Sequence, residues 1–139
     1  MTDRFTLRAE IDPDDLASIR HMEDPATNLF PYMEQAMKES LDEVEYQAQE
    51  WMWDHFENPT GQLETAFTKH PYGPFSAELW NDLPYAQRTN YGFSGMTDSI
   101  GRYYPYWPGI AWAENAVANA YPEVELIWQL MVDRALGRL

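Results

Sequence analysis

The sequence contains no cysteine, so disulfide bonds, thiolate metal ligands and cysteine nucleophiles are all excluded. Basic residues are also scarce, since 9 Lys and Arg stand against 23 Asp and Glu, for a net charge of −14. Proteins that bind duplex DNA draw most of their affinity from neutralised phosphates, so this balance argues against direct DNA binding. No apolar run approaches the roughly 20 residues that cross a bilayer, and we expect no membrane contact. The remaining class is a globular protein made and used, or assembled, in the cytoplasm.

The length and composition predict one domain. The chain has 139 residues, of which 45% are apolar and 15% aromatic, which is ordinary globular composition with extra ring surface. We expect a single domain over residues 1–139. Within it, residues 1–27 form an N-terminal extension of a strand and a short helix, and residues 28–139 form the core.

The negative charge is unevenly distributed. Residues 1–57 carry 15 acidic and 4 basic side chains, whereas residues 58–139 carry 8 and 5. One interpretation is a solvated acidic helix face. The other is a wall of negative potential that faces a channel or a basic partner. The sequence alone leaves both open.

One long segment has the clearest helical pattern. Between Asn28 and about Glu57, apolar residues recur in steps of three and four, and most charged residues lie off this stripe. A helix of this length spans about 40 Å, so in a small protein it must lie along a sheet or reach into a neighbouring subunit. The stripe consists of Phe30, Met33, Met37, Leu41, Val44, Ala48, Trp51 and His55/Phe56.

Shorter patterns complete the predicted fold. Residues 5–11 alternate as a half-buried strand, and Asp12-Pro13 then opens a short helix to about Met22. Residues 63–67 and 75–79 predict two strands joined by a Pro/Gly turn, and residues 90–109 predict a long loop. A last helix begins at Pro108 and is kinked or restarted at Pro122. We therefore expect an α+β fold, with a small antiparallel sheet packed with a long helix from the N-terminal half and a C-terminal helix.

No segment predicts catalytic chemistry. The three histidines, His21, His55 and His70, fall on separate predicted elements without metal-ligand spacing. Asp54, His55 and Glu57 come nearest to a cluster, and a partly buried structural histidine is the favoured interpretation. The sequence has no nucleophile elbow and no phosphate-binding loop. We expect no enzyme activity and no catalytic, cofactor-binding or metal-binding residues.

The aromatic segment near residues 90–112 is the other candidate site. Tyr, Trp and Arg are enriched at the energetic centres of protein–protein interfaces, which favours an interface. Two alternatives stay open, namely that part of the cluster is core and that it stacks a base or a sugar. The interface candidates are Tyr91, Phe93, Arg102, Tyr103, Tyr104, Tyr106, Trp107 and Trp112.

Three short motifs follow the long helix in a definite order. PTGQL occupies residues 59–63, LPYAQRTNYG residues 83–92 and WPGIAWA residues 107–113. Their order and spacing over about residues 29–139 resemble the minor tail component family of long-tailed bacteriophages, which are neck or tail-completion proteins. Asn90 stands where members usually have Glu before Tyr-Gly, and Trp112 stands where they usually have Phe.

The resemblance implies a structural protein of the virion, assembled in the host cytoplasm. Such a subunit forms a homo-oligomeric ring, most often of six copies, that joins the tail tube to the head-closure or connector protein. A tail terminator ring that caps the tail tube is an alternative position. DNA passes through such a lumen without sequence-specific binding, because an acidic wall repels it. The lumen-facing candidates are Glu34, Asp42, Glu45 and Glu50.

Functions of other classes fit the same composition. A small acidic binding module, such as an anti-repressor or a DNA mimic, would carry acids spaced like phosphates over one surface and work as a monomer or dimer. An enzyme that uses the helix face of Asp54, His55 and Glu57, or the aromatic loop, is a further alternative.

Overall fold

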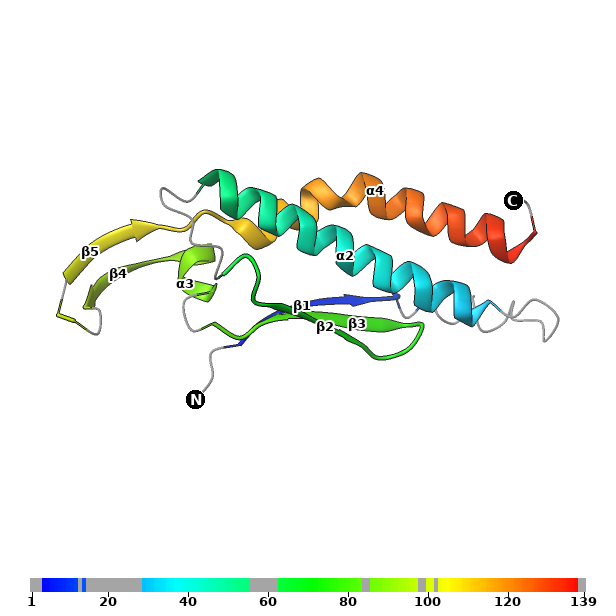
Figure 1. Ribbon diagram of the computed structural model, residues 1–139, viewed down its shortest axis with the longest axis horizontal. Coiled ribbons are helices and arrows are strands. Elements are labelled where there is room, and N and C mark those ends of the chain that lie inside the picture. The colour runs from blue at the N-terminus through cyan, green and yellow to red at the C-terminus, as the bar shows by residue number, and fades with distance from the viewer. Residues whose placement is uncertain are drawn as a thin grey trace.

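The computed structural model describes residues 4–12, 14, 29–55, 63–83, 86–97, 100, 101 and 103–137, and at residues 96, 104, 105 and 107 the backbone alone. A three-stranded antiparallel sheet packs against a long helix, and a C-terminal helix packs against that helix (Figure 1). This confirms the expected α+β class. The elements are β1 (Phe5–Glu10), α2 (Phe30–His55), β2 (Phe67–Pro71), β3 (Ser76–Asn81), α3 (Ala86–Tyr91), β4 (Gly92–Thr97), β5 (Tyr103–Pro108) and α4 (Trp112–Ala135).

Helix α2 follows the predicted stripe closely. Its 26 residues give it a length of about 40 Å. It runs along the three-stranded sheet (Figure 1). Met33, Met37, Leu41 and Ala48 of the predicted stripe are buried, and Phe30, Val44 and Trp51 are partly buried. Ala36, Ser40 and Met52 extend the buried face. His55, at the end of the stripe, is exposed, so the expected partial burial is wrong there.

The sheet has the strand order β1-β3-β2, with antiparallel pairing throughout. Alternate residues of β1 are more buried, as its sequence predicts, and Phe5 is 6% exposed. The expected strand over 63–67 is wrong in its first half, because residues 63–65 form a turn and β2 begins at Phe67. Side chains take the carbonyls of that turn, since Asn81 Nδ2 donates to the oxygen of Leu63 at 3.1 Å and Gln49 Nε2 to that of Glu64 at 2.9 Å.

The segment expected to be a long loop is a second, two-stranded sheet. β4 and β5 pair antiparallel and project from one end of the molecule (Figure 1). We call these two strands the arm. Tyrosine and tryptophan favour strands, and Gly92 and Gly95 take positive φ angles within β4, which glycine adopts without strain.

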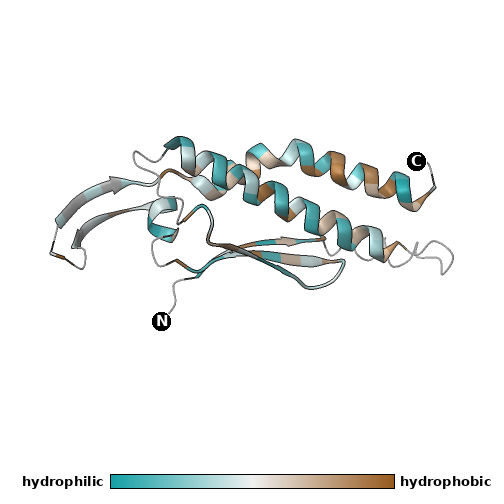
Figure 2. Cartoon of the chain, in the orientation of Figure 1, coloured by the Kyte–Doolittle hydropathy of each residue, from teal (hydrophilic) through white to brown (hydrophobic). Residues whose placement is uncertain are grey.

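Helix α4 runs antiparallel to α2 and lies beside it (Figure 1). It begins at Trp112 rather than at Pro108, because Pro108 is the last residue of β5 and three residues separate the two elements. It continues through Pro122, so no restart occurs there. Ala113, Ala116, Ala120 and Met131 are buried, and α4 is the more hydrophobic of the two long helices (Figure 2).

Several expectations lie outside the described residues. These are His21, Phe56, Glu57, residues 59–62 of the PTGQL motif and nearly all of the short helix over 13–22. The expected start of that helix is described at Asp12 and Asp14, where the carboxylate of Asp12 accepts a hydrogen bond from the backbone N–H of Asp14 at 2.9 Å. This is the geometry of an N-cap.

Candidate interaction surfaces

The arm presents aromatic side chains to solvent. Tyr103 and Tyr106 on β5 are 64% and 70% exposed, and Tyr91, which precedes β4, is 67% exposed. Phe93 is partly buried. Arg102 lies outside the described residues, and the side chains of Tyr104 and Trp107 are not described. Three of the predicted interface candidates are therefore exposed on or beside the arm.

Trp112 is a core residue, which corrects its prediction as an interface candidate. Its side chain is fully buried, and its ring centroid lies 4.7 Å from that of Phe5 and 5.6 Å from that of Phe67. Its indole Nε1 donates to the carbonyl oxygen of Ala86 at 3.1 Å. The residue faces inward because the first turn of α4 lies against the sheet and α3, so its ring joins them.

Asn90 joins the base of the arm to the start of α4. Its Oδ1 accepts the backbone N–H of Ala113 at 2.8 Å, and its Nδ2 donates to Glu114 Oε1 at 3.3 Å. Its backbone oxygen accepts the N–H of Ala111 at 3.0 Å. Ala111 is the N-cap residue of α4 and has no capping side chain, so the capping oxygen comes from Asn90, 23 residues before Ala113.

Gly109 allows the chain to pass close to Asn90. A Cβ atom built on Gly109 would lie 2.1 Å from the backbone oxygen of Asn90 and 2.5 Å from the backbone carbon of Tyr91. Both atoms belong to the backbone, so no rotamer change relieves the contact. We call the remaining described elements the body. The position where the arm meets the body therefore requires glycine.

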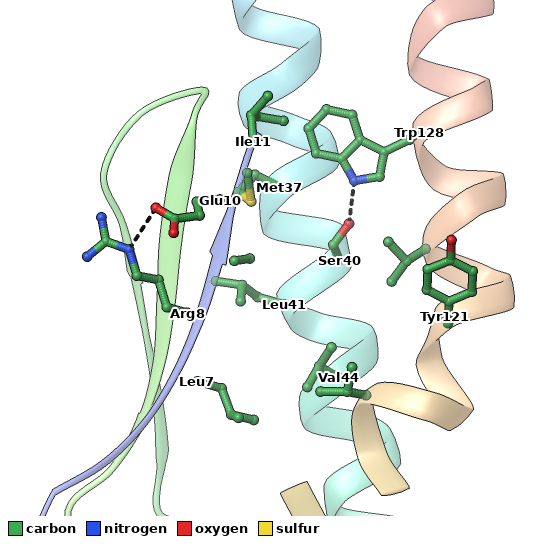
Figure 3. Close-up of a pocket in the computed structure, with 13 residues that line it drawn as sticks. Leu7, Arg8, Glu10, Ile11, Met37, Ser40, Leu41, Val44, Tyr121 and Trp128 are labelled. Atoms are coloured by element: carbon green, nitrogen blue, oxygen red, sulfur yellow. Dashed lines mark hydrogen bonds and ion pairs between the residues drawn. The ribbon is translucent and has the colours of Figure 1, made fainter. Parts of the chain in front are cut away.

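A groove runs between β1 and α4, with α2 as its floor (Figure 3). Its volume is about 480 Å³, and its lining is mostly apolar. Leu7, Ala9 and Ile11 come from β1, and Arg8 and Glu10 line its rim. The side chains that line it from the two helices are Met37, Ser40, Leu41, Val44, Val117, Tyr121, Val124 and Trp128.

The α4 wall of the groove is a second apolar stripe that the sequence interpretation missed. Val117, Tyr121, Val124 and Trp128 are spaced four, three and four residues apart, so they share one face of the helix. Their spacing is that of core residues, but Val117 is 47% exposed. The spacing places these four residues on one face of α4, but spacing alone does not determine whether that face packs against protein or lines a groove.

A hydrogen bond fixes the α4 wall of the groove to its α2 floor. Trp128 Nε1 donates to Ser40 Oγ at 3.0 Å, which connects α4 to α2 inside the groove (Figure 3). Tyr121 is 61% exposed, and its hydrogen bond to Glu125 raises the pKa of its hydroxyl above the ordinary value. Its ring also lines the groove.

The four acidic lumen candidates do not share one face of α2. Glu34 and Glu50 are sixteen residues apart, which places them about 160° apart around the helix. Asp42 and Glu45 both form ion pairs with Lys69 of β2. The hydrogen bond to Asp42 is the main cause that raises the pKa of Lys69 above its ordinary value.

The two described histidines stack on tryptophans. His55 lies 3.9 Å from Trp51 by ring centroids, and His70 lies 3.5 Å from Trp80. Arg4 also contacts Trp80, with its guanidinium carbon 3.6 Å from the ring centroid. Both histidines therefore make packing contacts with aromatic neighbours.

Glu78 accepts several donors on the sheet face opposite the helices. Tyr72 donates to its Oε1 at 2.7 Å and Trp80 Nε1 donates to the same atom at 3.2 Å. The Tyr72 hydrogen bond is the main cause that lowers the pKa of Glu78, and the same bond raises the pKa of Tyr72.

Within the described part of the chain, no group of three or more His, Asp or Glu side chains could hold a metal ion. Nor does any described helix combine the length and the apolar character needed to cross a membrane. Comparison with family models, with curated proteins and with solved structures finds no match.

Proposed function

We propose that this chain is a structural virion protein of a bacteriophage neck, whose copies associate into a ring that joins the tail tube to the head-closure or connector protein. The observation that carries the proposal is the arm, which projects from the body with Tyr103 and Tyr106 exposed (Figure 1). An isolated two-stranded hairpin is marginally stable in water, so an arm of this kind gains stability by packing on another molecule. Exposed tyrosines are typical anchors of such contacts.

The motif resemblance supports the same role and adds its details. It implies six copies for the ring and leaves the tail terminator position as the alternative. Both positions need a subunit with two separate contact surfaces, one for each neighbour in the ring. The arm and the groove are two such surfaces on one chain.

The acidic side chains of α2 bear on the lumen part of the proposal. Asp42 and Glu45 are paired with Lys69, so their contribution to a repulsive field is partly neutralised. Glu34 and Glu50 are exposed, and they are the stronger candidates for a wall that repels passing DNA. Because they lie on different sides of α2, at most one of them faces the ring axis directly.

The decisive experiment measures the mass of the purified chain by light scattering, alone and mixed with the tail-tube and head-closure proteins of the same phage. The expected result is an assembly of six times the 16.3 kDa chain mass, alone or with these partners. Quantitative mass spectrometry of purified virions should find about six copies of the chain per particle, as the proposed ring requires. A chain that stays single beside both partners, or that is absent from virions, contradicts the proposal.

The same samples distinguish the other class of function. An acidic binding module or DNA mimic would remain a monomer or dimer and would release DNA from a DNA-binding protein. Its acids would need to share a surface, whereas the candidates on α2 are spread around the helix and two are paired with Lys69. This geometry favours the structural subunit.

A further inference from the structure

The groove opens onto one of the two edges of the three-stranded sheet, the edge formed by β1. β1 pairs with β3 on one side and has no partner on the other among the described strands. Five consecutive residues of β1, from Leu7 to Ile11, line the groove, although their side chains alternate between the two faces of the sheet and those of Arg8 and Glu10 point away from the helices (Figure 3). Residues of both faces can line one groove only if the strand's backbone edge faces it. An unpaired edge of this kind accepts an additional strand.

The arm has the dimensions to fill this position. β4 and β5 have six residues each, as β1 has, and a strand of that length spans about 20 Å. In its two-stranded sheet, each strand of the arm has one edge without a described partner. The arm therefore offers an unpaired edge that matches β1 in length, with the exposed Tyr106 and Tyr103 beside it.

The charge of the arm suits contact with an acidic body. Residues 92–108 contain one acidic residue, Asp98, and one basic residue, Arg102, in a chain of net charge −14. Two bodies of this chain repel each other, because both are strongly acidic. A neutral, aromatic projection can enter the groove of a second copy without bringing like charges together.

The occupant must come from a second copy. The arm extends from the α3 end of the molecule and points away from the body, while the groove lies between β1 and the two long helices (Figures 1 and 3). A contact of arm to groove is heterologous, since each copy uses a different surface toward each neighbour. Repeated contacts of this kind close into a ring when the rotation allows it.

We propose that the arm of one copy adds a strand to the free edge of β1 in the next copy and places its aromatic side chains against the apolar groove. This inference rests on the proposed self-association and names the surfaces that carry it. The partner is therefore a second copy of this chain. The contact combines backbone pairing along β1 with burial of the α4 stripe.

Val117→Arg tests the groove. Val117 is 47% exposed, so the arginine can reach solvent in a single copy and the fold should be retained. In the assembly the same charge would be buried without a partner, so we expect association to weaken about tenfold or more. Leu126→Arg is the matched control, because Leu126 is 59% exposed, does not line the groove and lies about 180° away around α4.

A second variant tests the arm. The double substitution Tyr103→Ser and Tyr106→Ser removes exposed rings, so the unfolding transition of one copy should change little. It should abolish assembly as Val117→Arg does. An equimolar mixture of the two defective variants should form dimers but no rings, because the intact arm of one can enter the intact groove of the other only once.

Crosslinking locates the contact directly. The chain lacks cysteine, so single introduced thiols are unambiguous. A mixture of Ser94→Cys, which lies opposite Tyr106 and keeps both exposed tyrosines, and Val117→Cys should give a crosslinked dimer with a short bis-maleimide. A mixture of Ser94→Cys and Leu126→Cys should not. Equal crosslinking in both mixtures would overturn the inference.

The outcomes separate this inference from the proposed function. If the wild type assembles and Val117→Arg assembles equally well, the arm–groove contact is wrong while the ring proposal stands. If Val117→Arg loses only a virion partner and keeps self-association, the groove belongs to that partner and the inference also fails. If the wild type stays single beside its virion partners, both proposals fail.

Discussion

The body and the arm use the same class of residue in opposite ways. In the body, Trp112 is fully buried against Phe5 and Phe67 and donates its indole N–H to Ala86. In the arm, a few residues away in sequence, Tyr103 and Tyr106 are 64% and 70% exposed. Within one short segment, the ring of Trp112 therefore stabilises the fold of a single copy, whereas the rings of Tyr103 and Tyr106 are available for contact with a second molecule.

The difference depends on the junction between the two regions. Asn90 and Gly109 hold β4, β5 and the first turn of α4 together, so the chain turns from an exposed hairpin into a buried helix within a few residues. Substitutions at the junction and in the body should reduce the stability of one copy. Substitutions in the arm should reduce association and leave that stability unchanged.

The largest effect is expected for Gly109→Ala. The new Cβ would lie 2.1 Å from the backbone oxygen of Asn90, so the junction must open. We expect a loss of about 5 kcal/mol of unfolding free energy, or no folded protein, by urea denaturation. Gly101→Ala is the control, because Gly101 has φ of 88° but no atom within 4 Å of such a Cβ, and about 1 kcal/mol is expected there. Equal losses at the two glycines would show that the close approach at Asn90 is not required.

Trp112→Ala and Tyr106→Ala test the comparison most directly. Removing the buried Trp112 ring should cost about 4 kcal/mol in urea denaturation, because it leaves a cavity and removes one of the hydrogen bonds to the Ala86 carbonyl. Tyr106→Ala should change that free energy by less than about 0.5 kcal/mol, because the ring is 70% exposed. Light scattering of the folded samples should show the opposite ranking for assembly. The Tyr106→Ala variant should assemble poorly, whereas folded Trp112→Ala protein should assemble better. A large stability loss for Tyr106→Ala would place the arm within the folding unit of the body.

Asn90→Ala should give an intermediate loss. The change removes the oxygen that caps Ala113 and the donor to Glu114, and about 2 kcal/mol is expected. Asn115→Ala is the matched control, since Asn115 donates only within its own helix, to the oxygen of Ala111 at 2.8 Å. Its loss should be about 0.5 kcal/mol. Thermal unfolding of both variants, at one protein concentration, measures the difference, and an equal shift for both would remove the capping role of Asn90.

The smallest effect concerns the pH dependence of Glu78. Its folded-state pKa is lowered chiefly by the hydrogen bond from Tyr72, so the bond stabilises the protein above the usual carboxyl pKa. This contribution is lost as the pH falls through the lowered folded-state pKa. At the alkaline end, the pKa of Tyr72 is raised by the same hydrogen bond. The stabilisation from this bond therefore persists above the usual tyrosine pKa and is lost as the pH rises through the raised folded-state pKa of Tyr72.

Glu78→Gln should therefore lower the urea midpoint slightly at neutral pH and not at strongly acidic pH. Urea titrations of both proteins between pH 3 and pH 8 would measure the trend. The two proteins should converge toward the acidic end of the range. A constant difference over the whole range would show that Glu78 does not carry the pH dependence.

Several elements were predictable because their patterns are local. The steps of three and four from Phe30 to Trp51 predicted α2, and the alternation from Phe5 to Ile11 predicted β1. The arm was interpreted as a loop, because its glycines and prolines are also typical of loops and its pairing is between strands with little alternation. The start of α4 was placed too early, because Pro108 is typical of a first helical turn but here ends a strand.

The candidate surfaces were predicted only in part. Tyr91, Tyr103 and Tyr106 are exposed as an interface requires, whereas Trp112 is core. The groove has no signature in the sequence, since Val117 and Val124 have the spacing of core residues. Whether such residues are buried depends on what stands opposite them, and β1 and α4 lie far apart in the chain.

The sequence by itself determined the class of the fold, the long helix and the strongly acidic character of the chain, because composition and periodicity are properties of short stretches. Only the tertiary structure decided which aromatic residues are buried, which acids are paired and where the sheet keeps a free edge. The physical reason is that burial, ion pairing and strand order depend on which distant segments meet. In this molecule those meetings place Trp112 inside, leave the arm outside, and bring β1 beside an apolar groove.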